Sequence, residues 1–149
     1  MDNIIVYVDD ARYGLQILQP MLQTSVSGQP ARWIVVACAP RMTRRVSKWL
    51  RPSARASWRA DWAEQLFSQL RPALARHGDL VCTEIAGPRL CTQTQDLLRQ
   101  FGSARVLDAR RPKFGLDMQP VTSTQSQEPR GAIGYVAALA GAGWLVAID

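Results

Sequence analysis

The stretch Asn3-Ile4-Ile5-Val6-Tyr7-Val8-Asp9-Asp10 decides the fold of this chain. Its first six residues form an apolar, mainly β-branched run, which is typical of a strand buried on both faces in a parallel sheet. Two acidic residues follow at once, at the point where the strand ends. Because open α/β sheets bind ligands at the carboxyl ends of their strands, the sequence predicts both a parallel sheet and a ligand crevice beside Asp9 and Asp10.

The rest of the chain alternates between apolar runs and helical patterns. Strands are predicted at residues 33–38, 80–85, 104–108 and 144–148, and helices at 11–23, 58–74, 92–98 and 132–140. Five strands alternating with four helices indicate the α/β class. We therefore predict a single domain, residues 1–149, with an open, mainly parallel five-stranded sheet covered by helices on both faces.

Local signals predict where several elements begin and end. Asp10 is expected to cap the first helix, and Thr92-x-x-Gln95 resembles a capping box at the start of a later one. Residues 110–130 are predicted to form a long polar loop before the last helix and strand. The low-complexity part of this loop, residues 122–127, is expected to be mobile.

Net charge, cysteine content and the first residues indicate which partners and which cellular location to expect. The formal net charge of +6 and a pI near 9.9 favour acidic partners. Three scattered cysteines form neither a disulfide framework nor a zinc motif, and the first residues lack the pattern of a signal peptide. We therefore expect a cytoplasmic protein. Residues 131–148 are uncharged, but glycines interrupt them, so no transmembrane segment is predicted.

The order of elements resembles that of the universal stress protein family. Val8-Asp9-Asp10 is similar to the end of the family's first strand, with Asp10 and Ala11 in place of its small residues, and Gly87-Pro88-Arg89 is similar to its Gly-x-Pro turn. The predicted helix and strand within residues 132–148 resemble its last two elements. The resemblance implies a Rossmann-like fold of the adenine nucleotide alpha hydrolase type, with ATP or another adenine nucleotide as the family's ligand.

A nucleotide site of that kind would contain residues from both ends of the chain. The resemblance implies that Asp9 binds adenine or ribose, whereas the plainer interpretation is that Asp9 and Asp10 cap the first helix. The family's glycine-rich phosphate loop, Gly-x2-Gly-x9-Gly-Ser/Thr, is missing here, so we expect a degenerate or absent ATP site with millimolar affinity at best, and no bound cofactor. The candidate residues are Asp9, Asp10, Val36, Gly87, Arg110, Lys113, Gly115 and Gly131.

The segment 41–59 is strongly basic and contains no acidic residue. Val46, Trp49 and Leu50 fall on one face of a short predicted helix, so the segment is also amphipathic. Such a helix can bind nucleic acid or an anionic surface; the alternative is a solvated arginine face with Trp49 packed on the domain. The candidate polyanion-binding residues are Arg41, Arg44, Arg45, Lys48, Trp49, Arg51 and Arg55.

Catalytic and metal-binding signals are weak. His77 is the only histidine and has no recognisable nucleophile partner, and Cys91 is the only thiol expected near the ligand edge. We predict no catalytic or metal-ligating residue. The expected function is that of a regulatory or stress-response binding protein of the universal stress type, acting as a homodimer through residues 144–148. The alternative is a polyanion-binding module that uses segment 41–59.

Overall fold

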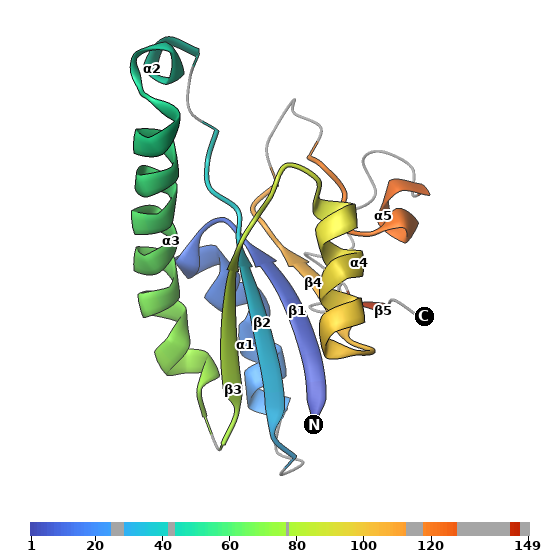
Figure 1. Ribbon diagram of the computed structural model, residues 1–149. Coiled ribbons are helices and arrows are strands. Elements are labelled where there is room, and N and C mark those ends of the chain that lie inside the picture. The colour runs from blue at the N-terminus through green and yellow to red at the C-terminus, as the bar shows by residue number, and fades with distance from the viewer. Residues whose placement is uncertain (25–28, 42–43, 77, 113–117, 128–143, 147–149) are drawn as a thin grey trace.

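Strands and helices alternate through most of the chain (Figure 1). The computed structural model describes residues 1–24, 29–41, 44–76, 78–112, 118–127 and 144–146. In the part described, no helix is both long and apolar enough to cross a lipid bilayer. The elements are β1 (Asp2–Val8), α1 (Ala11–Thr24), β2 (Ala31–Ala37), α2 (Arg44–Trp49), α3 (Pro52–Leu74), β3 (Leu80–Ile85), α4 (Leu90–Phe101), β4 (Arg105–Ala109), α5 (Ser123–Gln127) and β5 (Trp144–Val146).

Four strands form a parallel sheet in the order β3-β2-β1-β4, which confirms the predicted α/β class. The register pairs Val8 of β1 with Ala37 of β2 and with Ala109 of β4, and it pairs Ala37 with Ile85 of β3. The carboxyl ends of all four strands therefore meet at one edge. The opening apolar run is β1, which lies between β2 and β4 and is buried from Ile4 to Val8.

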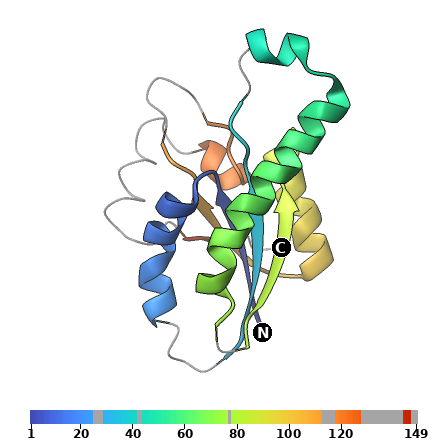
Figure 2. The ribbon, with the colours of Figure 1, turned by 90° about the vertical axis from the view of Figure 1, so that its left-hand side faces the viewer.

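Helices cover both faces of the sheet (Figure 2). Alternate side chains of β1 and β2 point to opposite faces, as the two-residue period of a strand requires. One face packs against α1 and α3, and the other packs against α4 and the segment that contains Val121. The buried residues of the first face include Val6, Val8, Trp33, Val35, Leu18, Phe67 and Leu70, and those of the second include Ile5, Tyr7, Ile34, Val36, Leu90, Leu97 and Val106.

The strand β5 pairs with β4 in the antiparallel direction, a detail that the predicted mainly parallel sheet did not specify. An antiparallel neighbour must enter at the end where the previous strand leaves, and Trp144 lies opposite Leu107 near the carboxyl end of β4. The described strand covers only Trp144–Val146 of the predicted residues 144–148. The helix predicted at 132–140 lies outside the described residues.

The prediction of a loop at residues 122–127 is wrong, because α5 occupies Ser123–Gln127. Thr122 and Gln125 are buried. The Gln125 side chain accepts the backbone N–H of Val121 at 2.7 Å and donates to the Asp108 carboxylate at 2.8 Å. Hydrogen bonds of the Gln125 side chain thus hold this part of a polar tract against the sheet.

The capping-box prediction is also wrong, because α4 begins at Leu90, two residues before Thr92. Its N-cap residue, Arg89, makes no capping bond with its side chain. The first helix agrees with its predicted cap, since the Asp10 carboxylate accepts the N–H of Tyr13 at 2.9 Å.

The long helix α3 begins at Pro52, six residues earlier than predicted. Proline suits the first turn of a helix because its missing N–H needs no partner there. The short helix α2 precedes it, and Figure 1 shows α2 standing beyond the edge of the sheet at the amino end of α3. The basic segment 41–59 therefore begins after β2, continues through α2 and ends in the third turn of α3.

Candidate anion site at the carboxyl edge of the sheet

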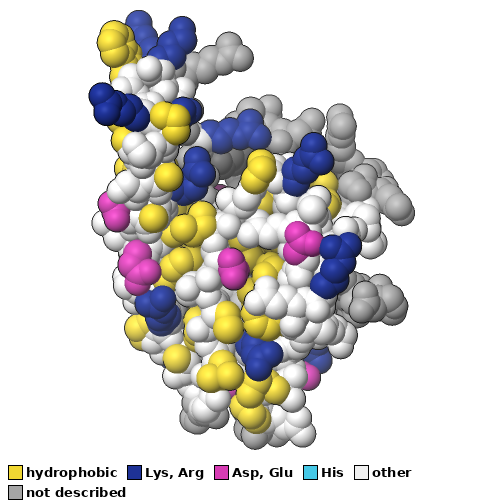
Figure 3. Space-filling view, viewed as in Figure 1, with side chains coloured by type: hydrophobic (Ala, Val, Ile, Leu, Met, Phe, Trp, Pro, Cys, Tyr) yellow, Lys and Arg dark blue, Asp and Glu magenta, His cyan; other side chains and the backbone are white. Residues whose placement is uncertain are grey.

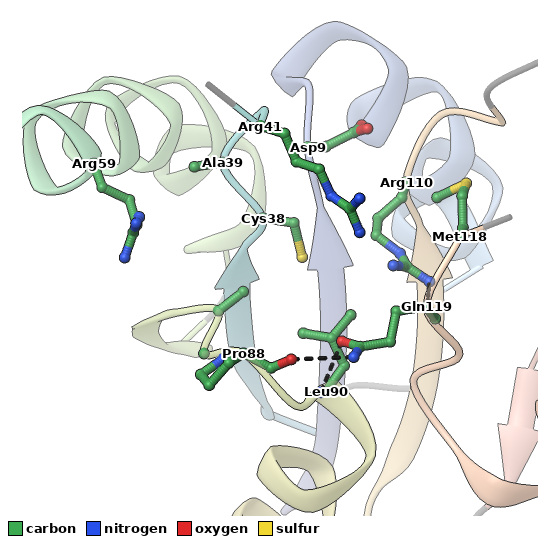
Figure 4. A pocket seen from close by; sticks show the side chains of 12 residues that line it. Asp9, Cys38, Ala39, Arg41, Arg59, Pro88, Leu90, Arg110, Met118 and Gln119 are labelled. Atoms are coloured by element: carbon green, nitrogen blue, oxygen red, sulfur yellow. Dashed lines mark hydrogen bonds between the residues drawn. The ribbon is translucent and has the colours of Figure 1, made fainter. Parts of the chain in front are cut away.

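A cavity of about 410 Å³ lies at the edge where the four parallel strands end. The segments that follow β1, β2, β3 and β4 all contribute to its wall, together with α3, as the parallel topology requires. Figure 4 looks into it. The lining residues are Asp9, Cys38, Ala39, Arg41, Arg59, Ala86, Gly87, Pro88, Leu90, Arg110, Met118 and Gln119.

Arg41 and Arg59 bring two exposed guanidinium groups to the cavity from different elements. Arg41 follows β2 and Arg59 belongs to α3; Figure 4 shows both side chains reaching toward the hollow. Among the residues that the structure describes, neither has an acidic partner within 4.0 Å.

Arg110 also lines the cavity, but its charge is already matched. Its Nε and Nη2 atoms each lie 2.8 Å from an oxygen of Asp108, and Nη2 donates to the Gln119 carbonyl at 2.6 Å. Burial lowers the pKa of Arg110, and the hydrogen bond and charge of Asp108 outweigh it, so the net shift is upward. This two-bond pair keeps Arg110 charged and fixed in position.

Asp9 is engaged in the same manner by the segment after β4. Its Oδ1 accepts the backbone N–H of Arg111 at 2.9 Å, and the Arg111 Nε lies 3.7 Å away. Only 9% of the Asp9 side chain is exposed. The carboxylate that the family resemblance assigns to adenine or ribose is thus hydrogen-bonded to the chain itself.

Two backbone amides beside the cavity are satisfied by glutamine side chains. Gly87 donates to Gln93 Oε1 at 2.8 Å, and Leu90, the first residue of α4, donates to Gln119 Oε1 at 3.1 Å. Gln119 Nε2 in turn donates to the Pro88 carbonyl at 3.1 Å, as the dashed lines in Figure 4 show. A bound anion would therefore depend on the arginine side chains more than on these amides.

A buried hydrogen bond between the hydroxyl groups of Tyr7 and Thr94 joins α4 to the sheet. The Tyr7 hydroxyl bonds to Thr94 Oγ1, and Thr94 Oγ1 also lies 2.6 Å from the Val121 carbonyl. Burial raises the pKa of Tyr7 to about 12 and outweighs the bond to Thr94, which lowers it. Tyr7 is therefore neutral near pH 7, and it joins β1, α4 and the segment before α5.

The predicted nucleotide residues are only partly brought together. Asp9, Gly87 and Arg110 line the cavity, whereas Asp10 caps α1 and Val36 lies in the core. Lys113, Gly115 and Gly131 lie outside the described residues. Cys91, the thiol expected near the ligand edge, is half-buried and donates to the Pro120 carbonyl at 3.2 Å.

The predicted polyanion residues separate into two groups. Arg41 lines the cavity, and the others belong to α2 and the start of α3. Arg45, Lys48, Trp49 and Arg51 are exposed there, Arg55 is half-exposed, and the side chain of Arg44 is outside the described part. The alternative interpretation was a solvated arginine face with Trp49 packed on the domain. The packing of Trp49 is wrong, since 87% of this tryptophan is exposed.

Sequence reasoning missed several lining residues. Arg59 had a signal, because it ends the basic segment one helical turn after Arg55. Cys38, Met118 and Gln119 had none, since a half-buried thiol, a methionine and a glutamine carry no motif. Gln119 matters most of these, because it bonds to Leu90, Pro88 and Arg110 at once.

This arrangement suits charge-assisted hydrogen bonding to a phosphate or carboxylate, for which the planar guanidinium group is well matched. Within the described ranges, no cluster of three or more histidine, cysteine or acidic side chains is able to hold a metal ion.

No protein-family model, no curated protein and no solved structure matches the chain.

Proposed function

We propose that this protein is a regulatory binding protein of the universal stress type, whose Rossmann-like fold has a degenerate nucleotide crevice. The crevice takes a small anionic ligand in place of an adenine nucleotide held in the family's manner. One observation carries the proposal: Arg41 and Arg59 face one cavity without an acidic partner among the described residues, while Asp9 and Arg110 are already paired.

The size and charge of the cavity support a small, multiply charged ligand. A volume of about 410 Å³ falls in the range of small-molecule sites. Arg110 and Arg111 are matched by Asp108 and Asp9, so the surplus charge at the cavity comes from Arg41 and Arg59. Two exposed guanidinium groups are screened by water, and we expect an affinity on the order of 0.1 to 1 mM for a polyphosphate.

The engagement of Asp9 argues against specific recognition of adenosine. The bond from the backbone N–H of Arg111 occupies Asp9 Oδ1 and fixes the orientation of this carboxylate, so a ligand would share the group with the chain. The chain also lacks the glycine-rich loop that would provide a preformed phosphate site.

We also propose that the protein acts as a homodimer through β5, which lies at the edge of the sheet.

Isothermal titration with tripolyphosphate tests the site. The double variant Arg41→Gln/Arg59→Gln should bind tripolyphosphate at least about tenfold more weakly than the unchanged protein, because it loses two charge-assisted contacts. A second pair, Arg45→Gln/Lys48→Gln, removes the same charge from α2 and should leave the affinity within about twofold.

Equal binding by the unchanged protein and the Arg41→Gln/Arg59→Gln variant would contradict the proposed site. If only the Arg45→Gln/Lys48→Gln variant bound tripolyphosphate more weakly, the anion site would lie on α2 instead.

A further inference from the structure

The tip formed by α2 and the first turn of α3 carries two exposed apolar side chains. Trp49 is 87% exposed, and Val46, three residues earlier on the same helix, is 50% exposed. Side chains three residues apart in a helix lie on the same face. An apolar pair of this size on a surface requires an explanation, because a large exposed indole is unfavourable in water.

Basic side chains surround this apolar pair. Arg45, Lys48 and Arg51 are exposed and Arg55 is half-exposed, and residues 41–59 contain no acidic residue. None of these four cations is within 4.0 Å of a carboxylate in the described residues. We call these six side chains, Arg45, Val46, Lys48, Trp49, Arg51 and Arg55, the basic tip.

The basic tip projects from the molecule. Figure 1 shows α2 above the sheet, at the free end of the long helix α3, and Figure 3 shows hydrophobic and Lys or Arg side chains gathered on this projection. Its surface is convex, with the apolar side chains mixed among the cations. A convex tip of this kind can enter a soft interface, whereas binding an extended strand of nucleic acid usually relies on a groove.

We propose that the basic tip docks the protein on an anionic phospholipid surface, with Trp49 and Val46 entering the headgroup region and the four cations contacting lipid phosphates. Tryptophan is the side chain that favours the membrane interface most clearly, since its indole is apolar and also carries a donor. Valine has no flat face on which a base can stack, which argues for lipid over nucleic acid. A second copy of the chain meeting the tip face to face is disfavoured, because it would bring like charges together.

The proposal predicts two separable contributions to binding. Each basic residue near an anionic bilayer contributes about a fivefold increase in affinity, which salt reduces. The insertion of Trp49 contributes an increase of about tenfold that depends less on salt. The inference is independent of the proposed ligand cavity, which lies at Arg41 and Arg59.

Co-sedimentation with vesicles tests the proposal. The full chain should bind phosphatidylcholine vesicles that contain phosphatidylserine and should bind pure phosphatidylcholine vesicles at least about tenfold more weakly. Arg45→Gln/Lys48→Gln should lower the affinity for the anionic vesicles by about 25-fold, and Trp49→Ser by about tenfold. The matched control, Arg12→Gln/Arg76→Gln, removes the same charge from two exposed arginines outside the basic tip and should have little effect.

Three results would overturn the proposal. The first is equal binding to both kinds of vesicle. The second is an equal loss in the control variant, which would reflect net charge alone. The third is tighter binding to a single-stranded oligonucleotide than to anionic vesicles, with the same dependence on Trp49, which would make the tip a nucleic-acid surface. Circular dichroism of each variant verifies that these exposed substitutions leave the fold intact.

Discussion

Charged residues at the carboxyl edge of the sheet differ in whether the chain itself neutralises them. Asp108 holds Arg110 through two bonds, and Asp9 holds the backbone of Arg111. The side chains of Asp9, Asp108 and Arg110 are largely buried, and an unpaired charge there would cost several kcal/mol. Arg41 and Arg59 are exposed, so water can solvate them until a ligand binds. This difference is the reason why we propose Arg41 and Arg59, and not the paired groups, as the ligand-binding residues.

Replacing Tyr7 by phenylalanine should change both the stability and its dependence on pH. At pH 7 the loss of the hydroxyl pair should reduce the free energy of unfolding by about 1 kcal/mol. The pKa of Tyr7 is raised to about 12 in the folded state from 10.0, so its contribution is complete below pH 10 and is lost as the pH rises from 10 to 12.

Urea denaturation between pH 7 and pH 12 measures this effect. The unchanged protein should lose more stability above pH 10 than Tyr7→Phe, by at most about 2.7 kcal/mol for a shift of about two units. Parallel profiles for the two proteins would mean that the Tyr7 phenol is not held in its neutral form by the fold.

At the level of elements, the strands were predictable because burial on two faces leaves a clear apolar run. The runs at Ile4, Trp33, Val81 and Val106 all fall in strands. The start of α4, α5 and the antiparallel β5 were not predictable, because they depend on contacts between distant residues. Leu90 meets Gln119, and Gln125 meets Asp108, at separations of 29 and 17 residues. No local pattern contains such a pair.

The candidate site was only partly predictable for the same reason. Topology alone indicated the edge beside Asp9, and the basic segment contained Arg41. The convergence of Arg41 and Arg59 required the path of the chain from β2 through α2 into α3, which no spacing rule provides. The engagement of Asp9 by Arg111 joins residues 102 positions apart and was equally hidden.

The contact between α1 and β1 should be sensitive to a single methyl group at Gly14. An alanine in the middle of a helix normally stabilises it relative to glycine by about 0.5 to 1 kcal/mol. A Cβ at Gly14 would lie 2.7 Å from a methyl carbon of Val8, which is fully buried. We therefore expect Gly14→Ala to destabilise the protein by about 1 to 3 kcal/mol in chemical denaturation.

The double variant Gly14→Ala/Val8→Ala provides the control for this prediction. Removing the Val8 methyl groups relieves the clash, so the two changes together should cost less than the sum of the two single changes. A stabilising effect of Gly14→Ala alone would show that α1 moves away from β1 at little cost.

On the scale of the whole molecule, one end contains both proposed surfaces. The helix α3 carries Arg59 at the cavity and adjoins α2 at its amino end, so the cavity and the basic tip share one helix. The opposite end, where the strands begin, has neither. A ligand in the cavity and a lipid surface at the tip would therefore lie on the same side of the protein.

The strand β5 at the edge of the sheet leads us to expect a homodimer. An edge strand has unpaired N–H and C=O groups, which favour pairing with a second copy. Light scattering after size exclusion should give twice the 16.5 kDa mass of the chain. Val146→Pro removes a donor and should shift the protein toward the monomer. A monomer at every micromolar concentration would contradict this expectation.

The ratio of the affinities for ATP and tripolyphosphate tests the central claim most directly. If arginine side chains bind the anion and Asp9 remains engaged with Arg111, adenosine adds little, and isothermal titration of the unchanged protein should give dissociation constants within about threefold of each other. The Asp9→Ala variant should preserve that ratio. Micromolar ATP binding, at least about a hundredfold tighter than tripolyphosphate and lost in Asp9→Ala, would contradict the account and restore adenine recognition to this edge of the sheet.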